Sequence, residues 1–272
     1  MTGLDLRPLS MGEILDRTFS LYRRYFVLFV GISAIPQILV LALRLAQILL
    51  LPPTYSSLSS TIWLGLVILV ASLVAYLLSQ GGTVLAVSEL YLGRPTTIGE
   101  SLRRVWNEIG SIFGVVFLNS LVIGVGLILF IVPGIYLACR LLVCVPAAMI
   151  EKRGARESLE RSFDLTRDNA VRSFLILLLS VVLSWAAQML LSAPFTLMIA
   201  LNRTDFAMLR IWMACSQIGA SLGSILIGPI LLIATSVYYY DLRVRKEAFD
   251  LQIMLNPDSQ AAPRTGPPSI LS

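Results

Sequence analysis

The sequence contains no histidine, few cysteines and few charges, and each shortage excludes a class of function. Without histidine, the 272-residue chain lacks the commonest general base and the commonest neutral metal ligand. Its three cysteines show no CxxC spacing, so we expect neither a disulfide framework nor a zinc site. We expect no metal, no cofactor and no catalytic residues. The cysteines are interpreted as small apolar residues inside apolar runs: Cys139, Cys144 and Cys215.

Charged residues make up 14% of the chain and hydrophobic residues 57%. Soluble domains carry about 25% charged residues, and a soluble chain of this composition would expose large apolar patches. The lipid bilayer is therefore the expected solvent. Residues 1–24 are polar and mixed in charge, which is not typical of a secretory signal, so we expect the first membrane helix to direct insertion.

Six apolar runs are long enough to cross a bilayer, since a span needs about 20 residues. We predict an all-α, polytopic membrane protein with a transmembrane domain over 1–255 and a disordered tail over 256–272. The stretch 111–150 is expected to form a hairpin that turns at Val132-Pro133-Gly134, and a re-entrant hairpin that enters and leaves by one face stays open. The predicted membrane helices are 25–51, 61–92, 111–132, 134–150, 173–201 and 211–240.

A short pattern recurs three times, each time directly before an apolar run. The copies are Glu13-x-Leu15-x-Arg17-x-Phe19, Glu100-x-Leu102-x-Arg104-x-Trp106 and Glu157-x-Leu159-x-Arg161-x-Phe163. Residues four apart are neighbours on a helix, so each copy sets Glu beside Arg and Leu beside an aromatic residue. The pattern predicts a pseudo-threefold repeat of an amphipathic helix followed by two membrane helices. These three cytoplasmic amphipathic helices are predicted over 10–22, 98–108 and 155–166, the first with a Ser10–Glu13 capping box.

Basic residues are concentrated in alternate polar segments. The segments before the first run, between the second and third, between the fourth and fifth, and after the sixth hold 4, 3, 6 and 4 of the 21 lysines and arginines. By the positive-inside rule, we predict six crossings of the plasma membrane with both termini in the cytoplasm. Aromatic residues near the ends of the runs are expected at the bilayer boundaries, with Tyr238, Tyr239 and Tyr240 at the inner one.

Three blocks of sequence carry a family resemblance. They are Leu6-Arg7-Pro8-Leu9-Ser10-Met11-Gly12-Glu13-Ile14-Leu15-Asp16, then Pro133-Gly134-Ile135-Tyr136-Leu137 with Arg140, Pro146, Glu151 and Leu159-x-Arg161-Ser162, and finally Tyr240-Asp241-Leu242-Arg243-Val244-Arg245-Lys246-Glu247 with Phe249-Asp250-Leu251. In these blocks the chain resembles the membrane domain of glycerophosphoryl diester phosphodiesterases and its stand-alone bacterial relatives. In that family the module can be fused to a soluble phosphodiesterase domain. No such domain is expected here, so the resemblance implies a membrane module without enzymatic activity.

Arg140 is the first candidate site residue, because a charge inside an apolar run is costly and usually faces the bundle interior or water. It is predicted to bind an anionic group such as a lipid phosphate. Two structural interpretations stay open: a side chain that reaches the outer headgroups, or a buried ion pair. Six further residues are predicted to contact anionic lipid headgroups on the cytoplasmic side: Arg153, Arg156, Arg172, Arg243, Arg245 and Lys246.

Three hypotheses for function follow from these features. The first is a non-enzymatic membrane module that binds membrane lipid or a partner protein, with no nucleic-acid partner. The second is a small transporter or permease component, which a polar cavity at the bilayer centre would favour and a dry, packed bundle would not. The third, an intramembrane enzyme, has no HExxH motif, no paired intramembrane aspartate and no serine with a base to support it.

Overall fold

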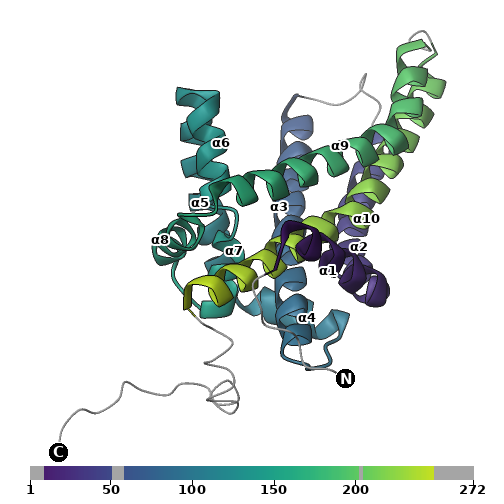
Figure 1. The fold of residues 1–272 in the computed structure, drawn as a ribbon. Helices are drawn as coiled ribbons and strands as arrows, with labels where there is room; N and C mark the ends of the chain where they lie inside the picture. The colour runs from purple at the N-terminus through teal and green to yellow at the C-terminus, as the bar shows by residue number, and fades with distance from the viewer. Residues whose placement is uncertain (1–8, 51–57, 202–204, 248–272) are drawn as a thin grey trace, which may run out of the picture.

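The computed structural model describes residues 9–50, 58–201 and 205–247, and within these ranges the chain is helical without strands (Figure 1). The predicted tail over 256–272, residues 248–255 of the predicted domain and Phe249-Asp250-Leu251 lie outside the described residues. The helices are α1 (Met11–Arg24), α2 (Phe26–Leu50), α3 (Leu58–Tyr91), α4 (Ile98–Asn107), α5 (Ile109–Leu129), α6 (Ile131–Arg140), α7 (Cys144–Glu151), α8 (Ala155–Thr166), α9 (Ala170–Leu201) and α10 (Phe206–Glu247).

Six stretches of the described chain are long and apolar enough to cross a membrane, so the prediction of an all-α, multi-pass membrane protein is confirmed. Large apolar side chains are exposed along them, as expected where lipid rather than water surrounds the helices. The stretches are Phe26–Leu49, Ile62–Tyr91, Ile109–Leu129, Ile131–Glu151, Ala170–Leu201 and Phe206–Glu247.

The three short polar helices form where the sequence pattern predicts them, as α1, α4 and α8. The capping box of α1 is confirmed: the Ser10 hydroxyl accepts from the Glu13 N–H at 3.3 Å, and the Glu13 carboxylate accepts from the Ser10 N–H at 2.6 Å. Thr97 caps α4 with one such bond, in which its hydroxyl accepts from the Glu100 N–H at 3.3 Å. These side chains satisfy backbone donors that the first turn of a helix leaves free.

The hairpin of the third and fourth spans turns earlier than the sequence predicts. α5 ends at Leu129 and the chain is extended at Phe130, whereas Pro133 and Gly134 lie inside the first turn of α6. Proline is tolerated there because the first N–H groups of a helix have no intrahelical partner. A side chain at Gly134 would overlap Leu127, so this glycine permits the close contact of α5 and α6.

The fourth span is divided into two helices, although the sequence predicts one helix over 134–150. α6 ends at Arg140, and α7 begins at Cys144 after a short turn. Pro146 explains the break, because proline cannot donate to the carbonyl four residues earlier and its ring clashes there. Pro146 instead occupies the first turn of α7, where no N–H is needed.

Each of these short helices packs mainly against a hairpin other than the one it precedes in sequence. α4 packs on α3 and α2, α8 packs on α7 and α5, and α1 packs mainly on α10. The long helices α9 and α10 lie side by side across the view of Figure 1, and the α5–α6 pair stands at its left. A side chain at Gly219 of α10 would overlap the backbone carbonyl of Leu191 in α9, so the backbones of the two helices are in direct contact there.

Candidate functional site

The C-terminal part of α10 carries several polar side chains that are buried within the protein. Tyr238, Tyr239 and Tyr240 are buried, with at most 5% of any of them exposed. Consecutive residues on a helix point about 100° apart, since a turn takes about 3.6 residues. The three rings therefore leave α10 in three directions, and each reaches a different hairpin of the bundle.

Tyr238 and Tyr240 bind the third and the first hairpin. The Tyr238 hydroxyl lies 2.9 Å from the Ser173 hydroxyl and donates to the Asn169 carbonyl at 3.2 Å, at the start of α9. The Tyr240 hydroxyl donates to the Ser88 hydroxyl of α3 at 3.0 Å. The Tyr240 ring also stacks on Tyr91, with 4.5 Å between ring centroids.

Tyr239 binds the second hairpin through Glu151, the last residue of α7. Its hydroxyl donates to the Glu151 carboxylate at 2.7 Å. We call Tyr238, Tyr239 and Tyr240 together the tyrosine hub. All three side chains are enclosed by protein, and their place at the inner bilayer boundary stays a prediction.

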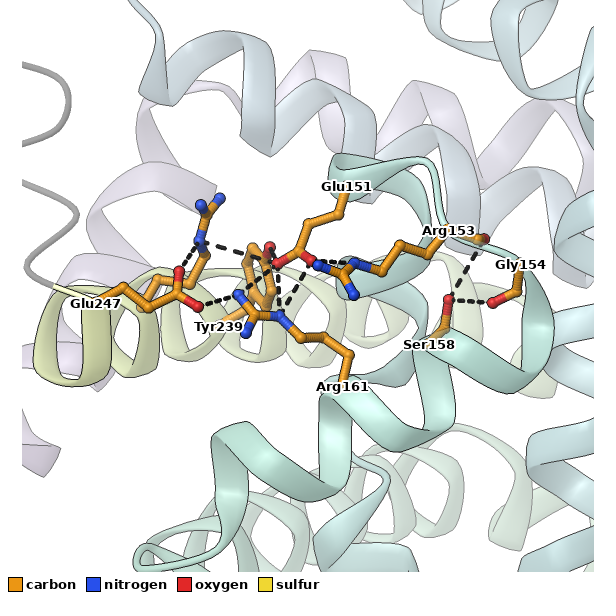
Figure 2. Close-up of polar contacts among 8 residues, drawn as sticks. Glu151, Arg153, Gly154, Ser158, Arg161, Tyr239 and Glu247 are labelled. Carbon is orange, nitrogen blue, oxygen red and sulfur yellow. Dashed lines mark hydrogen bonds and ion pairs between the residues drawn. The ribbon is translucent and has the colours of Figure 1, made fainter. Parts of the chain in front are cut away.

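Glu151 is also the centre of a cluster of charges shared by α7, α8 and α10 (Figure 2). Arg161 of α8 pairs with it at 2.9 Å and Arg153 at 2.6 Å. Glu247 of α10 bridges Arg161 and Arg243, and lies 3.0 Å from the Arg243 Nε. The carboxylates and guanidiniums alternate in the cluster, so each charge has an opposite neighbour.

Arg161 pairs with carboxylates of other helices rather than with its partner in the sequence pattern. The sequence places it beside Glu157, but the structure pairs it with Glu151 and Glu247. Burial disfavours its charged form, but the hydrogen bonds to Glu247 and Glu151 outweigh this and raise the pKa of the Arg161 guanidinium above its ordinary value. Arg104, the matching residue of the second copy, pairs with both its repeat partner Glu100 and with Glu89 at the end of α3.

Asp241 holds Leu9, two residues before α1, to the rest of the bundle. Its side chain is fully buried and accepts from the Leu9 backbone N–H at 2.7 Å. Arg172 of α9 and Arg245 of α10 pair with the same carboxylate at 3.3 and 2.9 Å. Both arginines also donate to the Leu9 carbonyl. The sequence analysis did not predict that Asp241 and the tyrosine hub join the helices to one another. The signal that could have indicated it is the run of three tyrosines followed by an aspartate at the end of the last apolar run.

Five of the six residues predicted to contact lipid headgroups make ion pairs within these clusters or beside them. Arg153, Arg172, Arg243 and Arg245 do so as described above, and Lys246 pairs with Asp168 at 3.1 Å. Arg156 differs, because its side chain is 88% exposed and its contact is a surface pair with Glu160 on its own helix. Lipid contact by the six remains a prediction, and Arg156 is the residue of the set most open to it.

Arg140, the residue predicted to bind an anionic group, is the last residue of α6 and is 8% exposed. Its guanidinium carbon lies 5.1 Å from the ring centroid of Phe163 in α8 and 5.8 Å from that of Tyr136. Its backbone carbonyl accepts from the hydroxyls of Ser162 at 2.8 Å and Thr166 at 3.0 Å, which fastens α8 to the end of α6.

The Arg140 side chain has no carboxylate partner among the described residues, and its Nε is buried without a hydrogen bond. The interpretation as a buried ion pair therefore finds no partner there. The guanidinium lies over the ring of Phe163 in α8 and near that of Tyr136, one turn earlier in α6, and the interpretation that the side chain reaches the outer headgroups stays a prediction. Arg140 is a buried cation held between two aromatic faces.

Comparison with known proteins gives one result. A family model described as the membrane domain of glycerophosphoryl diester phosphodiesterase matches residues 111–261, which is more than half of the chain and confirms the resemblance over that range. The match contains Arg140, Glu151 and the tyrosine hub. No curated protein and no solved structure matches the chain, and no group of three or more potential metal ligands occurs in the described residues.

Proposed function

The chain belongs to the family of the membrane domain of glycerophosphoryl diester phosphodiesterase, and from this premise we propose a non-enzymatic membrane module that binds an anionic lipid headgroup at Arg140. The observation that carries the proposal is the buried Arg140 guanidinium without a carboxylate partner in the described chain. Phosphate oxygens are suited to this position, because a guanidinium binds them in a planar, bidentate way.

The balance of energies favours an anion-binding arginine over a purely structural one. Each contact of Arg140 with an aromatic ring is worth about 0.5–2 kcal/mol. Removing a charge from water costs several kcal/mol per ion even after relaxation. The rings of Phe163 and Tyr136 therefore offset part of this cost, and a phosphate oxygen at the unpaired Nε would offset more.

Lipid that co-purifies with the full chain tests the proposal. The lipid is extracted from protein purified in mild detergent and quantified by mass spectrometry against protein. We expect an anionic species in reproducible stoichiometry, which Arg140→Gln removes and Arg140→Lys reduces. Arg44→Gln is the control, because Arg44 is also an arginine within a span, but its side chain is only half-buried and its guanidinium donates to the Ser72 hydroxyl at 3.5 Å. Unchanged anionic lipid in Arg140→Gln, with a normal gel-filtration profile, would refute lipid binding at this residue.

We further propose that the three repeat units of one chain, each a short helix and the hairpin after it, are arranged as a ring within the plasma membrane. In this arrangement α1, α4, α8 and both termini lie on the cytoplasmic side. The packing of α1 on α10, of α4 on α3 and of α8 on α7 supports this order. In the second and third copies the repeat arginine reaches back to a glutamate of the preceding hairpin, Arg104 to Glu89 at 2.7 Å and Arg161 to Glu151 at 2.9 Å. The distribution of lysine and arginine supports the orientation.

The second candidate function is that of a small transporter or permease component. One specific observation favours it, a polar cavity between α2, α3, α9 and α10. Such a cavity is the feature that separates a transport module from a dry, packed bundle.

A further inference from the structure

The cavity has a volume of about 270 Å³, is lined by residues of four membrane helices and is partly open to the outside of the bundle. Glycines and aliphatic side chains form part of the lining, and the polar residues in it are Ser33 and Gln37 of α2, Tyr76, Ser79 and Gln80 of α3, Ser184 and Gln188 of α9, and Ser224 of α10. Ligand pockets in proteins begin at about 300 Å³, so the space suits one small group rather than a large lipid.

The polar residues of the cavity lie near the middle of their helices. Gln37 is 11 residues after Phe26 and Ser79 is 12 residues before Tyr91. With a rise of about 1.5 Å per residue, these residues lie about 17 and 18 Å from their helix ends. That distance is close to half of the ~30 Å hydrocarbon thickness, which is the depth predicted for a transport site.

The lining offers hydrogen bonds without charge. The Gln80 amide donates to the Tyr76 hydroxyl, and the Gln188 amide donates to the Ser224 hydroxyl at 3.3 Å. Both bonds use the amide NH₂ group, and the amide oxygens remain as acceptors. The Ser79 hydroxyl is buried without any hydrogen-bond partner, which is costly unless an occupant supplies one.

These properties select the chemistry of the occupant. No lining residue is charged, so an ion would lose its hydration without compensation. An apolar group would leave the buried Ser79 hydroxyl unsatisfied. A hydroxyl group both donates and accepts, and several of them match a lining that does the same.

We propose that this cavity binds a neutral group that carries several hydroxyls, supplied either by a small polyol from water or by the headgroup of an uncharged glycolipid. The proposal rests on the cavity alone and is independent of lipid binding at Arg140. A narrow space of about 20 Å³ between α1, α9 and α10 shares Ser184, Ile227 and Leu231 with the cavity. It continues the cavity toward α1 and is too small to pass more than about one water.

Labelling of a cysteine in the cavity tests the proposal. Cys139, Cys144 and Cys215 are replaced by alanine in the full chain, and Ser79→Cys is added and labelled with N-ethylmaleimide in detergent. Sorbitol is the first probe, with polyethylene glycol of equal osmolality as the control that is too large to enter. We expect sorbitol to slow labelling by the factor 1 + [L]/Kd, which is roughly tenfold when sorbitol is at about ten times its Kd.

A second arm distinguishes the two sources of the occupant. The same protein is placed in nanodiscs with or without a monoglucosyl diacylglycerol. If sorbitol slows labelling of the Ser79→Cys thiol in lipid-free detergent, the occupant is a free polyol. If the glycolipid alone slows it, the occupant is a lipid headgroup. Absence of protection by either, or a Ser79→Cys thiol that never reacts, overturns the proposal.

Two glycine variants supply matched controls. A side chain added at Gly228, which lines the cavity, meets no atom within 4 Å at its Cβ, and the same holds for Gly124 in α5 outside the cavity. Gly228→Leu is expected to fill the cavity and abolish protection, whereas Gly124→Leu leaves it intact. Arg140→Gln is expected to leave protection unchanged, so failure of this proposal and failure of lipid binding are told apart.

Discussion

Replacing Tyr239 by phenylalanine tests the role of the tyrosine hub with the loss of a single hydroxyl. The ring is fully buried, and its hydroxyl donates to the Glu151 carboxylate at 2.7 Å. A hydrogen bond to a charged group is worth about 1.5–3 kcal/mol, against about 0.5–1.5 kcal/mol for a neutral pair. We therefore expect Tyr239→Phe to lower the free energy of unfolding by about 2 kcal/mol.

Tyr238→Phe and Tyr240→Phe are the matched controls, because their hydroxyls contact the neutral hydroxyls of Ser173 and Ser88. Each is expected to cost about 1 kcal/mol. The free energy of unfolding is measured by denaturant titration of the purified chain in mixed micelles, with circular dichroism as the signal. A loss for Tyr239→Phe no larger than that for the two controls would contradict the reasoning.

A double-mutant cycle separates the Tyr239–Glu151 contact from other effects of each change. Glu151→Gln leaves Arg161 paired with Glu247, so the charge cluster keeps part of its structure. Residues in direct contact couple by about 0.5–3 kcal/mol, and we expect a value within that range. Additive losses in the double variant would show that the hydroxyl and the carboxylate do not act together.

Three further predictions address packing, topology and the segment before α1. Gly219→Val is expected to lower the unfolding free energy by about 1–3 kcal/mol, because its side chain would overlap the Leu191 carbonyl; denaturant titration measures it, and no loss would contradict the close contact. A cysteine in place of Phe130, at the α5–α6 turn, is expected to react with an impermeant thiol reagent added outside intact cells; labelling from the cytoplasmic side alone would favour a re-entrant hairpin. Asp241→Asn weakens the hold on Leu9 and is expected to speed proteolysis of the segment before α1, whereas cleavage at the unchanged rate would count against this contact.

Helix boundaries were predicted well where the signal was local. α8 was predicted over 155–166 and forms over Ala155–Thr166, and the capping box at Ser10 forms as the pattern of a serine followed by a glutamate indicates. The break at 141–143 was not predicted, because the residues around it are apolar and hydrophobicity alone does not show that Pro146 lies in the first turn of a new helix. Hydrophobicity gives the length of a span, and proline position decides whether one helix fills it.

The candidate site was predicted in part. Arg140 was recognised because a charge in an apolar run is rare in any sequence, but its contact with Phe163 joins two separate helices and has no local signal. The same limit applies to Arg161, whose nearest carboxylate by helical spacing is Glu157, yet whose partners are Glu151 and Glu247. Helical periodicity ranks neighbours within one helix and gives no information on neighbours from another.

By itself the sequence determined that this chain belongs in a membrane, how many segments can cross it and where the amphipathic helices begin, because hydrophobic length and helix caps are set by residues close together in the chain. The tertiary structure decided that three adjacent tyrosines bind three hairpins, that Asp241 anchors Leu9 and that polar residues of four helices line one cavity. Those arrangements depend on contacts between residues up to 232 positions apart, which come into existence when the helices pack.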